Sequence, residues 1–230
     1  MFRLQDATKQ YGHKDGAVVA LEPTTLEISR GEFVAVVGAS GSGKTTLLSM
    51  LGGMLAPSSG KVWLGKESLY DLSVAERARA RQHNLGFVFQ TFNLIPYLSA
   101  LENVQIPLML RGTPNAADEG RILELLAKVG LESRVHHKPS ELSIGQQQRV
   151  ALARTLANDP AAILADEPTG NLDPETREQV LTFLEDLHHE GRTVIMVTHD
   201  PAAASRASRV IKLRDGVMVS DSASARAQVA

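Results

Sequence analysis

The sequence predicts an α/β fold built on a mainly parallel sheet, with an N-terminal antiparallel β subdomain and an inserted helical lobe. The runs FVAVV (33–37), AAILA (161–165) and TVIMVTH (193–199) are predominantly apolar, which is typical of strands buried on both faces. Helical patterns alternate with these runs, as in parallel strands joined by crossover helices. The mainly helical segment 91–157 interrupts that alternation.

The first 30 residues are expected to form short strands. FRLQDATKQY and VVALEPTTLEI both have extended character, and the turn-forming GHKDGA separates them. The run 33–37 then leads through a glycine-rich loop into a helix that starts near Gly43. The stretch Pro57–Gly60 ends this helix, and KVWLG (61–65) is the next expected strand.

The middle of the chain changes from strand to helix. Ser73 and Glu76 stand three residues apart and resemble a capping box at the start of a polar helix. LGFVFQ (85–90) is strand-like, and 145–158 has a helical pattern. An amphipathic helix is indicated by an i, i+3, i+4, i+7 repeat of apolar residues. These are Ile122, Leu125, Leu126 and Val129.

The C-terminal part carries one further helix and a hairpin. Asp173 and Pro174 fit the N-cap and first residue of a helix, whose apolar face is Val180, Phe183, Leu184 and Leu187. Residues 209–220 predict a hairpin that turns at Asp215–Gly216. We therefore divide the chain into a core with its β subdomain (1–90 and 158–220), an inserted lobe (91–157) and a frayed tail (221–230).

Composition limits the possible classes of function. The chain has 230 residues and a formal net charge of −2, so it has no basic field that would favour nucleic acid. It has no cysteine, which excludes disulfides and thiol catalysis. No run approaches the roughly 20 apolar residues that span a bilayer. We expect a cytoplasmic protein that reaches the inner face of the membrane only through a partner.

The segment GASGSGKT (38–45) fits the pattern G-x-x-x-x-G-K-[ST] of a phosphate-binding loop. Phosphate oxygens need several backbone N–H groups directed into one concavity, and side chains would block that approach. Lys44 would neutralise the β and γ phosphates of a bound nucleotide, and Thr45 would place its hydroxyl on Mg²⁺. The alternative, a plain Gly/Ser turn, leaves the strand–loop–helix context unexplained. The sequence therefore predicts a P-loop NTPase with a RecA-like core. The predicted nucleotide-binding residues here are Gly38, Ala39, Ser40, Gly41, Ser42, Gly43, Lys44, Thr45 and Thr46.

A second set of polar residues follows the run 161–165. Asp166 would lie at the carboxyl edge of the sheet, where open α/β sheets bind ligands, and would hold Mg²⁺ through water. Glu167 would orient or deprotonate the water that attacks the γ-phosphate. The structural alternative is that both acids simply face solvent at a strand end.

The sequence resembles a known family, the ATP-binding subunits of ABC transporters. LSIGQQQRVALAR (142–154) is similar to the family signature, usually LSGGQ followed by a helix reading QRVAIAR. The motifs also occur in the family's order, and the resemblance covers about residues 1–220. After the P-loop come Gln90, the signature, ILADEP, GNLD (170–173) and VTHD (197–200).

The resemblance implies roles around one nucleotide. Tyr11 would stack on adenine and Val19 would flank the base, although a lone tyrosine also fits a strand edge. Gln90 would contact Mg²⁺ or the attacking water and sense a membrane partner. His199 would hydrogen-bond the γ-phosphate and position Glu167. The predicted catalytic residues are thus Glu167, His199, Gln90 and Lys44, and the predicted metal ligands are Thr45, Gln90 and Asp166.

The resemblance also implies a second copy of the chain. Ser143, Gly145 and Gln146 would contact the γ-phosphate held by that copy, in an ATP-dependent homodimer. Asp173 would make an intersubunit contact, cap its helix, or do both. Ile144 departs from the family's usual glycine, and would weaken the signature contact only if the loop needs positive φ at this position.

Residues 90–112 and GNLDPETREQVL resemble the MacB and LolD subgroup, which implies export or lipoprotein extraction driven by an integral membrane permease on a separate chain. The apolar run Phe92, Leu94, Ile95, Pro96, Tyr97 and Leu98 would dock that permease or fill the lobe's own core. Three other functions stay open. They are an amino-acid importer ATPase, an ABC-type ATPase of a non-transport membrane complex such as cell-division signalling, and a nucleotide-dependent binding module without catalysis.

Overall fold

We analysed a computed structural model of the chain, which describes residues 1–12, 16–112, 115–170 and 172–223. The strands are β1 Phe2–Tyr11, β2 Val18–Ile28, β3 Phe33–Val37, β4 Ser59–Leu64, β5 Glu67–Ser68, β6 Leu85–Val88, β7 Ala162–Asp166, β8 Thr193–Thr198, β9 Arg209–Arg214 and β10 Val217–Asp221. The α-helices are α1 Lys44–Leu51, α2 Val74–Asn84, α3 Ala100–Met109, α4 Ala116–Lys128, α5 Ile144–Leu156, α6 Pro174–His189 and α7 Pro201–Ala204. Two 3₁₀ turns, η1 Glu132–Arg134 and η2 Pro139–Glu141, precede α5.

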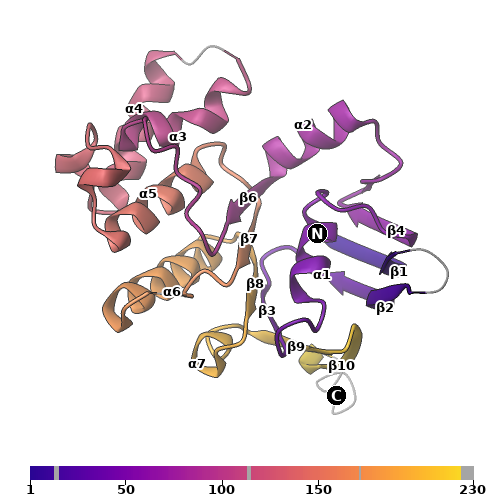
Figure 1. The fold of residues 1–230 in the computed structure, drawn as a ribbon. Helices are drawn as coiled ribbons and strands as arrows, with labels where there is room; N and C mark the ends of the chain where they lie inside the picture. The colour runs from indigo at the N-terminus through magenta and orange to yellow at the C-terminus, as the bar shows by residue number, and fades with distance from the viewer. Residues whose placement is uncertain (13–15, 113–114, 171, 224–230) are drawn as a thin grey trace.

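Two sheets form the body of the molecule (Figure 1). The 4-stranded sheet has the order β2-β1-β4-β5 and is antiparallel. The 6-stranded sheet has the order β10-β9-β3-β8-β7-β6, and all its neighbours are parallel except β10 and β9. This arrangement confirms the predicted α/β fold class with its N-terminal antiparallel part.

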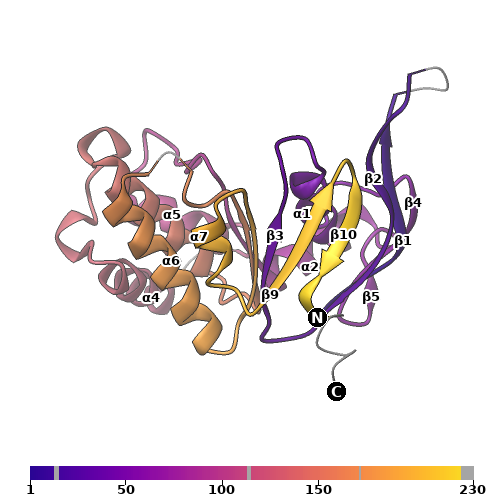
Figure 2. The ribbon, with the colours of Figure 1, turned by 90° about the horizontal axis from the view of Figure 1, so that it is seen from below.

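The parallel strands are buried on both faces because each face meets a different layer (Figure 2). One hydrophobic cluster joins α1, the antiparallel sheet and one face of the parallel sheet, including Val34 and Val36 of β3. A second cluster joins the opposite face to α5, α6 and α7, and includes Phe33. Alternate side chains of β3 therefore pack into two different hydrophobic clusters, which explains why the sequence of β3 is continuously apolar.

The helices α3, α4 and α5 enclose a third hydrophobic cluster. Ile122 and Leu126 of α4 are fully buried in it, as the amphipathic repeat predicted. Leu94 packs against this cluster and Phe92 against the second, whereas Tyr97 is 83% exposed. The apolar run 92–98 thus divides between internal packing and an exposed surface. The predicted domain boundaries at 90/91 and 157/158 stay predictions.

The local start and turn signals behave as predicted. Ser73 and Glu76 form a reciprocal capping box on α2, and Asp173 caps α6 with Pro174 as its first residue. The β9–β10 hairpin turns at Asp215 and Gly216, both with positive φ. The predicted turn at 12–17 includes residues 13–15, which lie outside the described residues.

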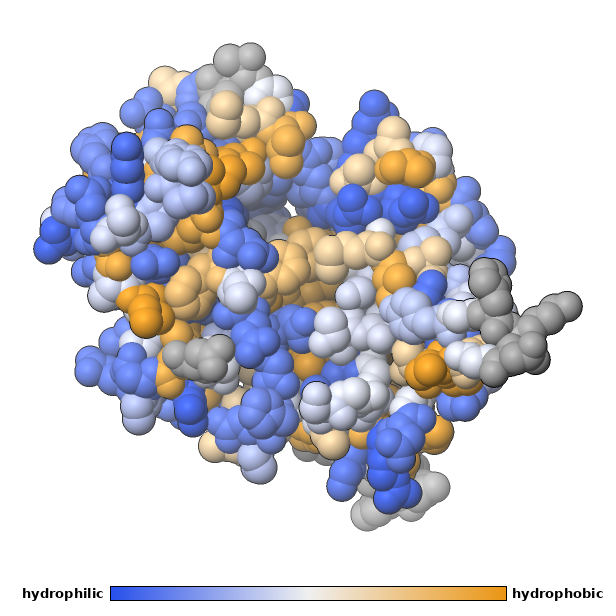
Figure 3. Space-filling model, in the orientation of Figure 1, coloured by the Kyte–Doolittle hydropathy of each residue, from blue (hydrophilic) through white to orange (hydrophobic). Residues whose placement is uncertain are grey.

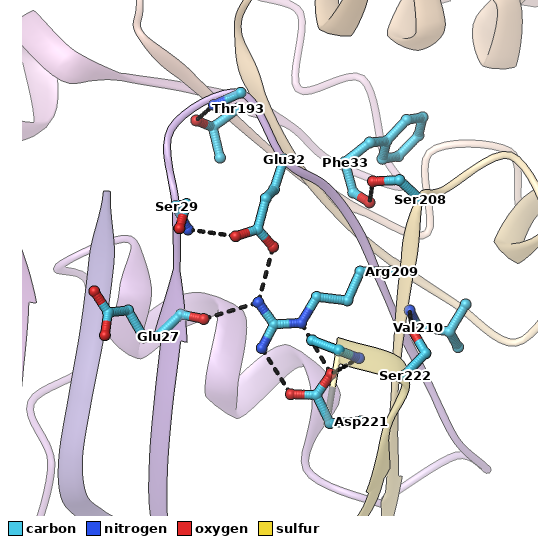
Figure 4. A network of polar contacts seen from close by, with 12 residues as sticks. Glu27, Ser29, Glu32, Phe33, Thr193, Ser208, Arg209, Val210, Asp221 and Ser222 are labelled. Carbon is cyan, nitrogen blue, oxygen red and sulfur yellow. Dashed lines mark hydrogen bonds and ion pairs between the residues drawn. The ribbon is translucent and has the colours of Figure 1, made fainter. Parts of the chain in front are cut away.

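An ion-pair network fastens the end of this hairpin to the rest of the fold (Figure 4). The Arg209 guanidinium contacts Asp221 at 2.6 Å and Glu32 at 2.8 Å, and donates to the Glu27 carbonyl oxygen at 2.9 Å. These hydrogen bonds hold the pKa of Asp221 below its usual range.

The predicted tail, 221–230, starts one residue too early. Asp221 is the last residue of β10, and its side chain is 10% exposed because Arg209 holds it. Ser222 Oγ accepts a hydrogen bond from the Val210 amide at 3.0 Å. Residues 224–230 lie outside the described part of the chain. Among the residues that are described, no helix is both long and apolar enough to cross a membrane.

Candidate functional site

The loop between β3 and α1 requires glycine at two positions. A Cβ on Gly38 would lie 2.3 Å from the Leu213 carbonyl oxygen. A Cβ on Gly43 would lie 2.3 Å from the Ala20 carbonyl oxygen, and Gly43 also has φ +98°. Both clashes are with backbone, which cannot move aside as a flexible side chain can. The glycines therefore allow β2 and β9 to approach the loop closely.

The loop forms one wall of a cavity of about 780 Å³. The lining residues are Ala20, Ala39, Ser40, Gly41, Gly43, Lys44, Thr45, Thr46, Gln90, Glu167 and His199. The backbone amides of Gly41, Gly43, Lys44 and Thr45 have no acceptor among the described residues, and α1 begins at this point. Unpaired amides at a helix N-terminus favour an anion, so the wall fits a phosphate group.

Lys44 is held under the loop before any ligand arrives. Its side chain is buried, at 7% exposure, and Nζ donates to the carbonyl oxygens of Gly38 at 2.9 Å and Ala39 at 3.0 Å. Ser42 Oγ is also buried and has no hydrogen-bond partner among the described residues. The positive charge therefore lies within the wall that the glycines shape.

Asp166 ends β7 beside the start of α1. Its Oδ1 accepts a hydrogen bond from Thr45 Oγ1 at 3.1 Å. Burial raises the pKa of Asp166 and the charge of Glu167 adds to the rise, whereas Thr45 and Lys44 oppose it. No group of three His, Cys, Asp or Glu side chains gathers among the described residues. Asp166, Thr45 and Gln90 thus offer the small oxygen set with which Mg²⁺ binds a phosphate substrate.

Glu167 and His199 come from neighbouring strands, β7 and β8, and face each other. His199 Nδ1 is 3.0 Å from both carboxylate oxygens of Glu167. The Glu167 side chain is 17% exposed, whereas His199 is 71% exposed. Glu167 has φ +46°, an unfavourable conformation for a residue with a side chain, and its amide donates to the Val197 carbonyl oxygen at 3.0 Å. The strained backbone of Glu167 is supported by this hydrogen bond and holds its carboxylate at the cavity wall. A carboxylate in this position is suited to act on a water molecule.

Tyr11 and Val19, predicted beside the adenine, are among the residues that do not line the cavity. Tyr11 ends β1 and is 47% exposed, with Lys9 Nζ 5.3 Å from its ring centroid. Val19 lies in β2, and its neighbour Ala20 lines the cavity instead. Sequence reasoning missed Ala20 because nothing in an extended segment marks which of two adjacent residues faces a ligand. The roles of Tyr11 and Val19 beside adenine stay predictions.

The signature residues form the start of α5, away from the cavity. Ser143 is the N-cap, its Oγ accepts from the Gln146 amide at 3.2 Å, and Gln146 Oε1 accepts from the Ser143 amide at 2.9 Å. A Cβ on Gly145 would lie 2.9 Å from Thr176 Oγ1 of α6. None of Ser143, Gly145 and Gln146 lines the cavity of their own chain.

The structure also answers the question raised by Ile144. It is the first residue of α5, it is absent from the positive-φ residues, and it is 60% exposed. Isoleucine is therefore compatible with the backbone, and most of its side chain is exposed. Asp173 caps α6 by accepting from the Thr176 amide at 3.0 Å, so the capping interpretation holds. Its intersubunit contact stays a prediction, and Asn171 lies outside the described residues.

Comparisons with known proteins agree with this geometry. Residues 21–170, more than half of the chain, match the family described as ABC transporter. The chain is 47% identical to the macrolide export ATP-binding/permease protein MacB of Hyphomonas neptunium, over 99% of this chain and 35% of that protein. It is 45% identical to an uncharacterized ABC transporter ATP-binding protein of Thermotoga maritima, over 94% of this chain and 92% of the relative. The chain thus spans about a third of the length of the MacB relative.

Solved structures give the same result in three dimensions. A dimeric structure of MJ0796, a bacterial ABC transporter cassette, has a TM-score of 0.89 and 44% identity, covering 96% of this chain and 97% of that one. A dimeric post-hydrolysis state of the same cassette, bound to ADP and Pi, has a TM-score of 0.88. The chain belongs to the ABC transporter family and is an ATPase cassette of that family.

Proposed function

We propose that two copies of this chain bind two Mg·ATP head to tail, hydrolyse them, and thereby drive an integral membrane permease in export. The observation that carries the proposal is the division of the site. One chain supplies a glycine cradle, Lys44, Asp166 and the Glu167–His199 pair, while its signature residues lie elsewhere. A site divided in this way is completed by a second copy.

The residues of the chain divide the chemistry among them. The backbone amides of Gly41, Gly43, Lys44 and Thr45 bind the phosphate oxygens, and the Lys44 side chain neutralises part of their charge. Thr45, Asp166 and Gln90 would hold Mg²⁺, which would neutralise further charge on the phosphates. Glu167 orients the attacking water and accepts its proton, and His199 holds the Glu167 carboxylate in place. The Ser143 segment of the second copy contacts the γ-phosphate through the N-terminus of α5.

Homodimerisation is supported by the dimeric MJ0796 structures, with which the chain shares 43% and 44% identity. The start of α5 is exposed, including Ile144 at 60%, so it is accessible to a second copy. The capping box keeps the Ser143 backbone in a fixed conformation before the copies meet.

A groove between α2, β6 and α3 is the proposed contact for the permease. It encloses about 720 Å³ and opens as a notch between the lobe and α2 in Figure 3. Apolar side chains line part of it, among them Phe87, Phe89, Ile106 and Leu110. Such a surface accepts a short amphipathic helix. The MacB relatives are described as ATP-binding/permease proteins, so we place this chain at the inner face of the membrane, bound to a permease.

Turnover of Glu167→Gln tests the proposed chemistry. Glutamine keeps the shape of the side chain but cannot accept the proton of water. We expect phosphate release to slow by about 100-fold or more, while the Kd for ATP stays within about threefold of wild type. The control is Glu190→Gln, which changes an exposed acid that pairs with Lys128 far from the cavity. Equal turnover in Glu167→Gln and wild type would remove Glu167 from the mechanism.

A further inference from the structure

Gln148 is a buried polar side chain that the chemistry above does not use. It lies on α5 and is 0% exposed. Its amide nitrogen donates to the Pro168 carbonyl oxygen at 3.2 Å, while its Oε1 is buried without a partner among the described residues. A carbonyl oxygen only accepts, so the group that faces Pro168 is the NH₂. Half of this amide is therefore unsatisfied, which is unfavourable for folding and indicates a role other than stability.

The Pro168 carbonyl belongs to the turn that carries Glu167. The turn is closed by a hydrogen bond from the Gly170 amide to the Glu167 carbonyl oxygen at 3.0 Å. Glu167 itself has φ +46°, and a residue with a side chain keeps this conformation only when its surroundings support it. Within the described part of α5, the side chain that hydrogen-bonds this turn is that of Gln148.

The same helix begins at Ser143. Gln148 follows Ser143 by five residues, which is about 7.5 Å along a helix axis. One rigid element therefore contacts the catalytic turn of its own chain at one end of this span and presents the signature segment at the other.

We infer that Gln148 is a positioning residue that fixes Glu167 relative to the signature end of α5. Its amide holds the Pro168 carbonyl, and through it the turn from which the Glu167 carboxylate projects. When Ser143 contacts the nucleotide of a second copy, α5 and the turn keep a defined relation, so that Glu167 meets its water only in the assembled site. This inference rests on the proposed function and adds a residue to it.

Gln148→Met in the full chain tests the inference, because methionine keeps the volume and removes the donor. We expect kcat to fall by at least about tenfold, since a small displacement of a catalytic group has a large effect, while KM and Kd for ATP stay within about threefold. The matched control is Thr155→Val, which removes a hydrogen bond from the same helix to the Phe87 carbonyl oxygen at 2.8 Å. Thr155→Val should keep kcat within about twofold.

A double-mutant cycle separates positioning from general packing. If Gln148 acts through Glu167, Gln148→Met has little further effect on turnover in a Glu167→Gln background. Gln148→Glu supplies a second readout that does not depend on the methionine variant folding. A neutral glutamic acid donates O–H to Pro168, and burial raises its pKa. Its kcat relative to wild type should therefore be highest at acid pH and fall as pH rises.

Three results would overturn the inference. They are unchanged kcat in a folded Gln148→Met, equal losses in Gln148→Met and Thr155→Val, or additive effects of Gln148→Met and Glu167→Gln. A failure of the proposed function is distinguishable, because wild-type protein would then release no phosphate, or Glu167→Gln would turn over as fast as wild type, whatever residue stands at 148.

Discussion

The two halves of the nucleotide site differ in how far one chain prepares them. The loop 38–45 is fixed by close backbone contacts with β2 and β9, and its lysine is buried and hydrogen-bonded. The start of α5 is capped but exposed, and none of its signature residues lines a cavity of its own chain. The phosphate cradle therefore forms on folding, whereas the proposed signature contact would form only on assembly.

The largest effect is expected for Gly43→Ala in the cradle. The added Cβ would meet the Ala20 carbonyl oxygen at 2.3 Å, and φ is +98°. We expect the Kd for ATP to rise by about 100-fold or more, because the amide groups that bind phosphate would move. Gly65→Ala is the control, since Gly65 also has positive φ (+61°) but its Cβ would meet nothing within 4 Å. Titration with a fluorescent ATP analogue measures both. Similar affinities in the two variants would show that the cradle does not depend on this close approach.

A smaller effect, and on a different quantity, is expected for Ser143→Ala. The monomer's Kd for ATP should not change, because Ser143 does not line the cavity, but turnover should fall by about tenfold. Loss of the cap also lowers the free energy of unfolding by about 1 kcal/mol. Ser73→Ala removes the same kind of capping box from α2 and is the control for that structural loss. An equal loss of turnover in Ser143→Ala and Ser73→Ala would show that Ser143 has no specific role in catalysis.

Asp221→Asn tests how much the ion pair of the β9–β10 hairpin, which contacts the loop 38–45, contributes to stability. The β9–β10 turn contacts the loop directly, since the Gly216 amide donates to the Ser42 carbonyl oxygen at 3.2 Å, and Arg209 with Asp221 fastens the other end of the hairpin. We expect the free energy of unfolding at pH 7 to fall by about 2 kcal/mol.

The pH dependence of this variant has a definite sign. The hydrogen bonds from Arg209 lower the pKa of Asp221 in the folded state. Its contribution is therefore complete above the unfolded value and is lost as pH falls below about 4. Urea unfolding at pH 7 and at pH 3 should show the gap between wild type and Asp221→Asn closing at the lower pH. A gap of constant size would contradict the ion-pair assignment.

The smallest effect is expected for Ile144→Gly, which restores the residue that the family commonly has. Ile144 is helical and exposed, so the backbone does not need glycine there. We expect turnover within about threefold of wild type and a loss of less than about 1 kcal/mol of unfolding free energy. A tenfold gain in phosphate release would show that isoleucine hinders the signature contact.

The sequence predicts those parts of the site whose conformation is determined by residues close together in the chain. The loop 38–45 carries its geometry in its own glycines, and the Asp173–Pro174 pair marks the start of α6 without reference to anything distant. The buried strands follow from the run of apolar residues that two-sided burial requires.

The parts that escape prediction depend on contacts between distant segments. Arg209 pairs with Glu32, which lies 177 residues away, and no local pattern marks either residue. The last residue of β10, Asp221, is held by Arg209 of β9, and the sequence pattern ends the hairpin one residue before it. Gln148 is one of three consecutive glutamines on α5, and the sequence does not distinguish it from the other two. The fold does so, because it brings Gln148 against Pro168, 20 residues away.

The molecular mass of Glu167→Gln in solution, measured with and without nucleotide, shows whether two copies of the chain assemble around ATP. This variant should bind ATP without consuming it, so the assembled state persists. We expect a monomer without nucleotide and a dimer with Mg·ATP, and the dimer should be lost when Ser143→Ala is added or when ATP is replaced by ADP. Light scattering after size-exclusion chromatography measures the mass. A monomer at saturating Mg·ATP, or a dimer whose formation does not depend on nucleotide, would rule out a nucleotide site shared between two copies.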